Sequence, residues 1–354
     1  MAVTAIDIDR NNSMGLVRYY LAMMVLISHF NIAFGTDFPV PTSSYNAVGG
    51  FFALSGFLVY RSWLHSDGFR HYMLKRMRRI IPSYTFIILL AAFGLVGVST
   101  LPWQDYFLST GWLKYVVCNL MFLNFLAPDL PGVFQNMPVH AVNGLLWTIK
   151  IEIMLYLSIP LFSYVLVRLH RRIGQSLKWT IALIAAIYIF SMLYRMLFSH
   201  LYLTTGKEIY NILSRQMFGQ LMYFYTGVLI YFTYGFFMKH RLKIVVLALV
   251  LMLACSGMGW YQIVLGPVVV SVLTLFFSLI SDVKVLSAFN VDNVSYDIYL
   301  FHFPVILLLG QSAMFHTLPA WVQLLAAVCA TALLACFSWF VIGKRFLHGG
   351  VRRG

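Results

Sequence analysis

The residues best suited to chemistry in this chain are an arginine and a histidine in its first long apolar run, residues 14–34. Ten residues, most of them apolar, separate Arg18 from His29. Eleven steps of an α-helix complete about three turns, so both side chains project from one helix face, about 16 Å apart along the axis. Ionisable side chains at membrane depth are costly and commonly mark functional sites. The spacing predicts a helix with a fixed positive charge near its cytoplasmic end and a base near its outer end.

A third ionisable candidate is Glu152, in the apolar run 144–167. Counted along their helices, Glu152 lies about 12 Å and His29 about 8 Å below the outer membrane face, so the two can meet at one depth. A carboxylate beside a neutral imidazole orients the ring and stabilises it when it takes a proton. The pattern fits a catalytic pair, and it also fits a structural pair between two helices. Lys150 faces away from Glu152 by about 200°, so we do not expect it to neutralise the carboxylate.

A basic block stands at the start of the third apolar run. Arg76 and Arg79 are three residues apart and share a helix face. We expect a span to open here, with Pro82 in its first turn, where a missing N–H is harmless. Helix N-termini and arginine side chains both favour phosphate. The alternative is an ordinary anchor for a cytoplasmic loop, which is the more frequent role of a bare basic cluster.

Two further segments carry polar or small residues inside apolar runs. Gly49, Gly50, Ser55 and Gly56 allow close approach of another helix, which usually means packing alone. The segment 295–305 places His302 near mid-membrane, and its proline frees backbone carbonyls nearby. An isolated histidine at this depth is most often packed and hydrogen-bonded.

The composition restricts the class of protein that can hold these residues. Of the 354 residues, 61% are hydrophobic and 10% are charged, and the mean hydropathy is +0.82. Soluble domains carry about 25% charged residues, so a polytopic, all-α membrane protein is the remaining class. The net charge of +14 does not indicate a nucleic-acid partner, because the basic residues form short clusters between apolar runs. Four cysteines without metal-ligand spacing predict no metal site.

The positive-inside rule predicts ten spans, with both termini cytoplasmic and the stretch 112–127 outside as an interfacial or re-entrant piece. In this arrangement 19 of the 25 lysines and arginines lie inside and two lie outside. A spanning 112–127 would move the basic segment 168–178 to the outside. The predicted spans are 14–34, 45–61, 80–98, 144–167, 179–199, 212–237, 244–257, 260–280, 294–312 and 320–342.

Taken in order, these motifs resemble the family 3 membrane-bound acyltransferases, which modify bacterial glycans. The similarity rests on the pair Arg18 and His29, the segment 50–58, the block 76–82, the segment 146–156 and the segment 295–305. It predicts one transmembrane acyltransferase domain over 1–354, with a family-like core over about 13–342. Some members carry an additional soluble domain, and we expect none here. Lys150 departs from the family, which usually has small residues at this place.

The resemblance implies transfer of an acyl group, usually acetyl from cytoplasmic acetyl-CoA, to a sugar hydroxyl of a lipid-linked or exported glycan. The acyl-CoA is a donor substrate, not a permanently bound cofactor. The expected location is the bacterial inner membrane, with membrane lipids and polysaccharide-assembly proteins as further partners. The site residues that it implies are His29 and Glu152 for catalysis, Arg18, Arg76 and Arg79 for the donor, and Trp147, Tyr296, His302 and Ser55 for the substrate pocket.

The distance from Arg18 to His29 is comparable to an extended pantetheine arm, so the donor phosphates can stay near the arginines while the thioester reaches His29. We expect His29 to act as general base, with direct attack favoured over a covalent acyl-histidine. The oxyanion donor is Tyr296, His302 or a backbone N–H.

Three other functions remain open from the sequence. A transporter or exporter of an acylated glycan or small metabolite also suits ten spans with buried charges, although it predicts an internal repeat and none is visible. An acyltransferase of unrelated fold and a polytopic glycosyltransferase are the other two. A glycosyltransferase favours acidic residues at the membrane surface, and this chain has only eleven acidic residues.

Overall fold

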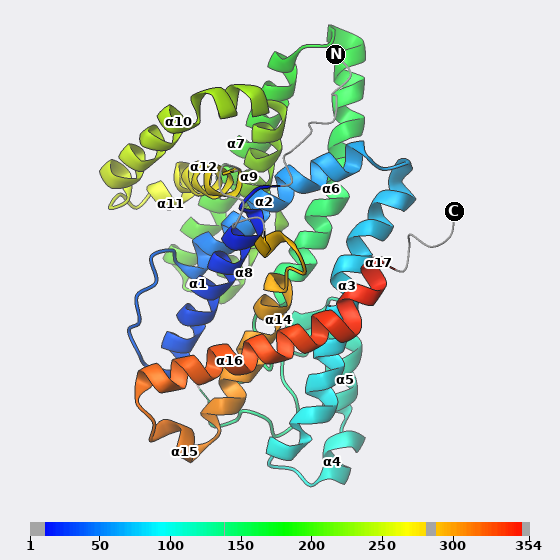
Figure 1. Cartoon of the computed structure of the whole chain (residues 1–354), viewed down its shortest axis with the longest axis vertical. Helices are drawn as coiled ribbons and strands as arrows, with labels where there is room; N and C mark the ends of the chain where they lie inside the picture. The colour runs from blue at the N-terminus through cyan, green and yellow to red at the C-terminus, as the bar shows by residue number, and fades with distance from the viewer. Residues whose placement is uncertain (1–10, 138, 281–287, 349–354) are drawn as a thin grey trace. The chain divides into compact units, whose positions relative to one another are not determined.

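The structure is a computed structural model that describes residues 11–137, 139–280 and 288–348. These residues form helices and no β-strand (Figure 1), as the apolar runs predict. Six of the helical segments are long and apolar enough to cross a bilayer, which agrees with a polytopic membrane protein. They are α1 (Met14–Phe34), α2 (Ser44–Leu64), α3 (Gly68–Gly94) continued by the 3₁₀ turn η1 (Leu95–Val98), α6 (Leu146–Ile173), α7 (Leu177–Thr205) and the segment Ala320–Leu347.

The other predicted spans fall on shorter or more basic helices. Two of these helices, α12 and α14, are apolar but have only 13 and 16 residues. The stretch 112–127 forms the 11-residue helix α5, about 16 Å long and too short to span. The count of ten therefore stays a prediction. The helices concerned are α8 (Glu208–Ser214) with α9 (Met217–Phe232), α10 (Tyr234–Cys255), α11 (Tyr261–Val264) with α12 (Gly266–Ser278), and α14 (Ser295–Gly310).

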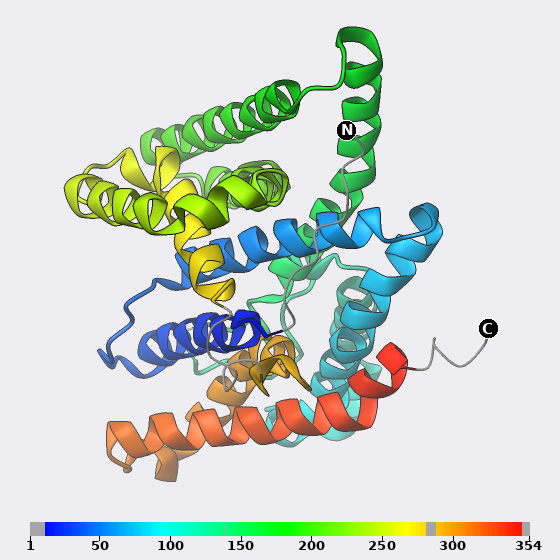
Figure 2. The ribbon, with the colours of Figure 1, turned by 45° about the horizontal axis from the view of Figure 1, so that its top comes forward.

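The chain divides into two compact units built from alternating segments. Unit 1 comprises residues 1–17, 45–73 and 151–290, and unit 2 comprises residues 18–44, 74–150 and 291–354. In unit 1, α9 packs against α7 and α12, and α10 packs along α12 (Figure 2). In unit 2, α14 packs against α16 (Ala320–Ser338). Unit 2 also holds α4 (Trp103–Leu108), α5 (Thr110–Leu120), η2 (Asn124–Leu126), α15 (Ala313–His316), the π-helical turn η4 (Trp339–Gly343) and α17 (Lys344–His348), and unit 1 ends at the short η3 (Ala288–Asn290).

The basic segments that we predicted as loops are largely helical. Helix α3 begins at Gly68, and α10 runs from Tyr234 through the basic stretch 238–243. The expectation that a helix opens at the block 75–79 is therefore wrong, and Pro82 lies well inside α3 instead of in its first turn. The reason is that backbone hydrogen bonding continues a helix beyond the part that is apolar enough for lipid. Any role of Arg76 and Arg79 thus rests on their side chains and not on a helix N-terminus.

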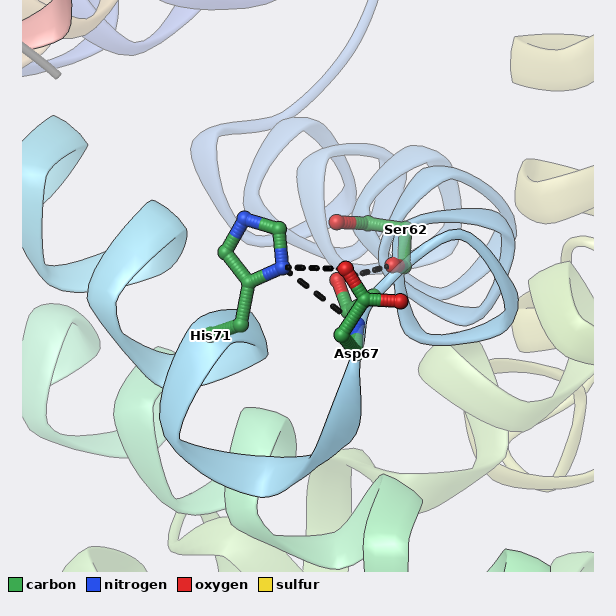
Figure 3. Close-up of polar contacts among 4 residues, drawn as sticks. Ser62, Asp67 and His71 are labelled. Atoms are coloured by element: carbon green, nitrogen blue, oxygen red, sulfur yellow. Dashed lines mark hydrogen bonds and ion pairs between the residues drawn. The ribbon is translucent and has the colours of Figure 1, made fainter. Parts of the chain in front are cut away.

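A tight turn joins α2 to α3. Gly68 adopts a positive φ of +83°, which a glycine takes without strain. Figure 3 shows His71 folded back over this turn, where its Nδ1 accepts the backbone N–H of Asp67 at 3.3 Å and lies 3.6 Å from the Asp67 carboxylate. The Ser66 hydroxyl donates to the Ser62 carbonyl at 2.6 Å. These contacts satisfy polar groups at the helix ends, as a membrane-surface turn requires.

Two glycines bring α2 and α9 of unit 1 into backbone contact. A Cβ on Gly56 would lie 1.9 Å from the Phe224 carbonyl oxygen, and a Cβ on Gly227 would lie 1.9 Å from the Ala53 carbonyl oxygen. Neither position has room for a side chain. The small residues of the second apolar run therefore serve helix packing, as their pattern indicates.

Two prolines inside helices leave backbone carbonyls that other side chains satisfy. A proline has no N–H, so the carbonyl four residues earlier loses its helical partner. Before Pro304 this carbonyl belongs to Leu300, and the buried Asn143 donates to it at 2.8 Å. Before Pro160 it belongs to Tyr156, and the Tyr72 hydroxyl donates to it at 2.8 Å. Each bond is required because lipid offers no alternative donor.

Replacing Asn143 with alanine should lower the thermal stability of the purified protein by about 1–3 kcal/mol, because the Leu300 carbonyl then stays buried and unsatisfied. In the same protein with Pro304→Ala, the restored N–H can bond Leu300, so the cost of Asn143→Ala should shrink. Unfolding measured on the four proteins of this cycle gives the coupling. Additive effects would show that Asn143 does not serve this carbonyl.

The predicted topology places residues 128–143 outside. A cysteine at position 136, in a variant without the native cysteines, should react with a membrane-impermeant maleimide added to intact spheroplasts. A cysteine at position 66, in the turn between α2 and α3, is the matched inner-face control and should react only after lysis. Reaction of position 136 only after lysis would contradict the topology.

Candidate active site

The centre of the candidate site is a pair of histidines in unit 2. His29 of α1 and His302 of α14 stack with ring centroids 5.3 Å apart and an angle of 27° between planes. The His29 Nδ1 lies 3.1 Å from the His302 Nε2. His302 is fully buried, whereas His29 retains partial exposure. The sequence placed each histidine in a membrane helix but gave no sign that they touch.

The second hydrogen bond of His302 fixes the protonation pattern of the pair. Its Nδ1 lies 3.1 Å from the Ile298 carbonyl oxygen, one helical turn earlier. A carbonyl only accepts, so this Nδ1 carries the proton and the neutral ring presents a bare Nε2. The His29 Nδ1 must then donate to that Nε2. In the neutral pair the His29 Nε2 is left without a proton, which is the state that a general base requires.

Aromatic packing holds the His29 ring in place. Phe303 meets it edge-on with centroids 5.3 Å apart and an angle of 79° between planes. Phe303 in turn approaches Gly144, where a Cβ would lie 3.2 Å from its ring. The ring of His29 is therefore held between a hydrogen bond on one nitrogen and an apolar edge contact.

A second set of polar contacts supports α14 next to His302. The Tyr299 ring lies 6.1 Å from the His302 ring, and the Tyr299 hydroxyl lies 2.9 Å from the Thr148 hydroxyl oxygen. Thr148 also donates to the Leu145 carbonyl at 2.9 Å. Since both side chains are buried, they fix the start of α6 against α14. The segment 143–148 thus contacts the part of α14 that carries His302 and helps to hold it in place.

The three candidate donor-binding arginines lie on two helices of unit 2. Arg18 sits on α1 about 16 Å from His29 along the axis, and it is half-buried. Arg76 and Arg79 are also half-buried on α3, whereas their neighbour Arg78 is exposed. An arginine that only anchors a helix at the membrane surface does not need to be buried. Arg78 has the exposure expected of such an anchor, whereas Arg76 and Arg79 are half-buried.

Sequence reasoning missed Asp297 of α14. This carboxylate is 1% exposed, accepts the Ser338 hydroxyl at 2.6 Å and interacts electrostatically with Arg79. It therefore compensates part of the positive charge that Arg79 places on α3. The signal was present, because an acidic residue inside the apolar run 294–312 is a functional candidate by the same argument as His29.

The predicted pocket residues of unit 2 have different surroundings. The Tyr296 hydroxyl donates to the Ile80 carbonyl at 3.4 Å, about 9 Å along α14 from His302. Both ring nitrogens of His302 are engaged, so it offers no free N–H to an oxyanion. Trp147 is half-buried in the first turn of α6. Lys150 lies over the Phe125 ring, 5.0 Å from its centroid.

Glu152 and Ser55 belong to unit 1. The Glu152 carboxylate accepts a hydrogen bond from the Tyr156 hydroxyl, one turn later on α6. Ser55 is half-buried on α2 beside the close-packed Gly56. The contact predicted between His29 and Glu152 joins residues of the two units and stays a prediction, as does the role of Ser55.

Comparison with known proteins identifies the family. Residues 11–342 match the family described as "Acyltransferase domain", of acyltransferase type 3. An O-acetyl transferase of Shigella phage Sf6 is 30% identical over 154 residues, which are 42% of this chain and 44% of that relative. No solved structure matches the chain. A match over nearly the whole chain, around a membrane-embedded histidine pair, shows that the protein belongs to the family 3 acyltransferases.

Proposed function

We propose that this acyltransferase is an O-acetyltransferase that moves an acetyl group from cytoplasmic acetyl-CoA to a hydroxyl of a cell-surface or exported glycan. The observation that carries the proposal is the chain of hydrogen bonds from His29 through His302 to the Ile298 carbonyl, from which we infer an unprotonated His29 Nε2. The name of the phage relative, an O-acetyl transferase, supports the reaction. The family supports a membrane location, which we propose to be the bacterial inner membrane.

The transfer needs one base. A sugar hydroxyl attacks the thioester carbonyl while His29 Nε2 takes its proton, so a C–O bond forms and a negative charge develops on the carbonyl oxygen. Collapse of this intermediate breaks the C–S bond, and the CoA sulfur takes the proton from His29. The charge that the imidazolium carries in between is shared with His302, whose Nε2 accepts from His29 Nδ1. Direct attack uses every contact observed, so a covalent acyl-histidine is not required.

The donor binds along unit 2. The phosphates of acetyl-CoA lie near Arg76 and Arg79 on α3, and Arg18 lies between these phosphates and His29. Arginine binds phosphate through several N–H donors in a fixed plane. Asp297 interacts with Arg79 only electrostatically, so the guanidinium donors of Arg79 stay available to the phosphates. Tyr296 and Trp147 of the same unit line the path of the donor.

The oxyanion donor remains to be assigned among the original candidates. His302 has both nitrogens engaged, and the Tyr296 hydroxyl donates to Ile80. A backbone N–H is then the remaining candidate donor to the developing charge.

The decisive experiment is mass spectrometry of surface glycans from cells with and without the gene. Deletion should remove one acyl mass increment from one polymer, and a plasmid copy should restore it. His29→Ala should not restore it, because loss of a general base typically costs 10²–10⁴-fold. Normal acylation in cells that express His29→Ala at wild-type level would contradict the assignment.

Two variants of His302 distinguish its hydrogen bond to His29 from its role in packing. His302→Gln keeps an oxygen that can accept from His29 Nδ1, whereas His302→Phe fills the site without an acceptor. Both should leave the KM for acetyl-CoA unchanged, and kcat should fall further in His302→Phe than in His302→Gln. Equal kcat values for the two variants would show that the hydrogen bond to His29 does not matter.

Replacing Arg76 and Arg79 together with glutamine should raise the KM for acetyl-CoA about tenfold or more, since each removes a charge-assisted hydrogen bond. Higher salt should weaken donor binding in the wild type more than in the double variant. At saturating donor, kcat should change little. Arg78→Gln, on the exposed side of the same helix, is the matched control and should keep the wild-type KM. If the double variant inserts correctly and binds acetyl-CoA as the wild type does, the arginines only anchor the helix.

A further inference from the structure

Unit 1 contains a half-buried cation, Arg195, that the chemistry above does not use. Arg195 lies within α7, ten residues before its end at Thr205, which is about 15 Å along the axis. No carboxylate among the described residues forms an ion pair with it. An arginine at this depth without a carboxylate partner is costly, so its retention points to a ligand.

Two tyrosines of neighbouring helices surround this arginine. The Arg195 guanidinium lies over the Tyr45 ring, 4.5 Å from its centroid, and the Tyr45 and Tyr223 rings meet edge to face at 6.2 Å. Tyr223 is fully buried and packs against Gly49, where a Cβ would lie 2.4 Å from its ring. Residues of α2, α7 and α9 thus form one cluster, which we call the Arg195 cluster: Arg195, Tyr45 and Tyr223.

The hydrogen-bond donors of the cluster are poorly satisfied within the described structure. The Arg195 guanidinium contacts both phenol hydroxyls, and the two hydroxyls contact each other. The Arg195 Nη1 and both hydroxyls are nevertheless shielded from solvent and form no hydrogen bond of acceptable geometry. Unpaired buried donors each cost about 1–3 kcal/mol. A ligand with several acceptor oxygens would remove this cost.

The surroundings indicate that the ligand comes from the bilayer. Beside Arg195 on α7, the side chains of Leu193, Met196 and Leu197 are 56%, 42% and 53% exposed. In a membrane helix such apolar exposure faces lipid. Tyr45 lies in the first turn of the 21-residue helix α2, whose N-terminal N–H groups add positive potential. A negative headgroup on an apolar chain fits a donor cluster next to a lipid-facing surface.

We propose that the Arg195 cluster binds the phosphate group of a membrane amphiphile. The tetrahedral phosphate accepts from the Arg195 guanidinium and from the two tyrosine hydroxyls, and the apolar chain lies along α7. In the predicted topology the start of α2 is at the outer face, so the bound phosphate lies in the outer half of the membrane. If the acceptor glycan is lipid-linked, which rests on the proposed function, this cluster holds its lipid phosphate.

The test measures binding and not turnover, so its failure is distinguishable from failure of the proposed function. Dodecyl phosphate is titrated into the purified full chain in neutral detergent, with dodecanol and inorganic phosphate as the two other arms. Dodecyl phosphate should bind and raise the unfolding midpoint, and neither other compound should do so at the same concentration. Equal stabilisation by dodecanol would overturn phosphate recognition, and equal binding of inorganic phosphate would overturn the membrane amphiphile as its source.

Two variants assign the binding to the cluster. Arg195→Gln should weaken dodecyl phosphate binding about tenfold or more, since it removes charge-assisted hydrogen bonds. Arg168→Gln is the matched control, because Arg168 of α6 also stacks on a tyrosine, with 5.1 Å to the Tyr164 ring centroid, but belongs to no such cluster. It should bind as the wild type does. Equal affinities for the two variants would overturn the proposal.

Tyr223→Phe provides a second measurement of the same binding if Arg195→Gln does not fold. Removing an unpaired buried hydroxyl should leave the ligand-free unfolding midpoint unchanged or higher, while dodecyl phosphate binding weakens severalfold. A purely structural role would not give this combination. Unchanged affinity in Tyr223→Phe would show that its hydroxyl does not contact the ligand.

Discussion

The hydrogen bond between His29 Nδ1 and His302 Nε2 is the contact on which the chemistry that we propose for unit 2 depends. A carbonyl of α14 sets the tautomer of His302, and His302 sets the tautomer of His29. The arrangement replaces the carboxylate of the familiar Ser–His–Asp triad with a neutral ring. A neutral orienting group costs less to bury than a carboxylate does, which suits a site inside a membrane.

Uncharged side chains also satisfy the backbone carbonyls that two helix prolines leave without a partner. Interior prolines in α6 and α14 free the carbonyls of Tyr156 and Leu300, and both are taken by side chains, Tyr72 and Asn143. Asn143 lies just before α6 and Thr148 lies in its first turns, so one short segment satisfies α14 at two points. The Arg195 cluster differs from these two sites, because the Arg195 Nη1 and the hydroxyls of Tyr45 and Tyr223 have no hydrogen bond of acceptable geometry.

The sequence predicts the membrane class and the polar face of α1 because both depend on local composition and helix period. It predicts His29 for the same reason, as an ionisable residue in an apolar run. The pairing of His29 with His302 was not predictable, because it depends on how α1 packs against α14, 273 residues later in the chain. The predicted helix boundaries were wrong at α3 and α10, because basic residues indicate the membrane surface but do not end a helix. Asp297 meets the same sequence criterion as His29, because it is an ionisable residue inside an apolar run, but its contacts with Ser338 and Arg79 depend on tertiary packing.

The placement of charge along α1 and α3 gives a physical reason for transfer across the membrane instead of transport. A transporter must move its substrate past the site and therefore needs weak, repeated contacts. Here the half-buried arginines lie on the basic half of α3 and at one end of α1, and the base lies about 16 Å further along α1. This arrangement suits a donor whose phosphates stay at one side while its thioester reaches the other. In the proposed function, the acyl group would cross by extension of the pantetheine arm, and no charged group of the donor would have to enter the apolar interior beyond Arg18.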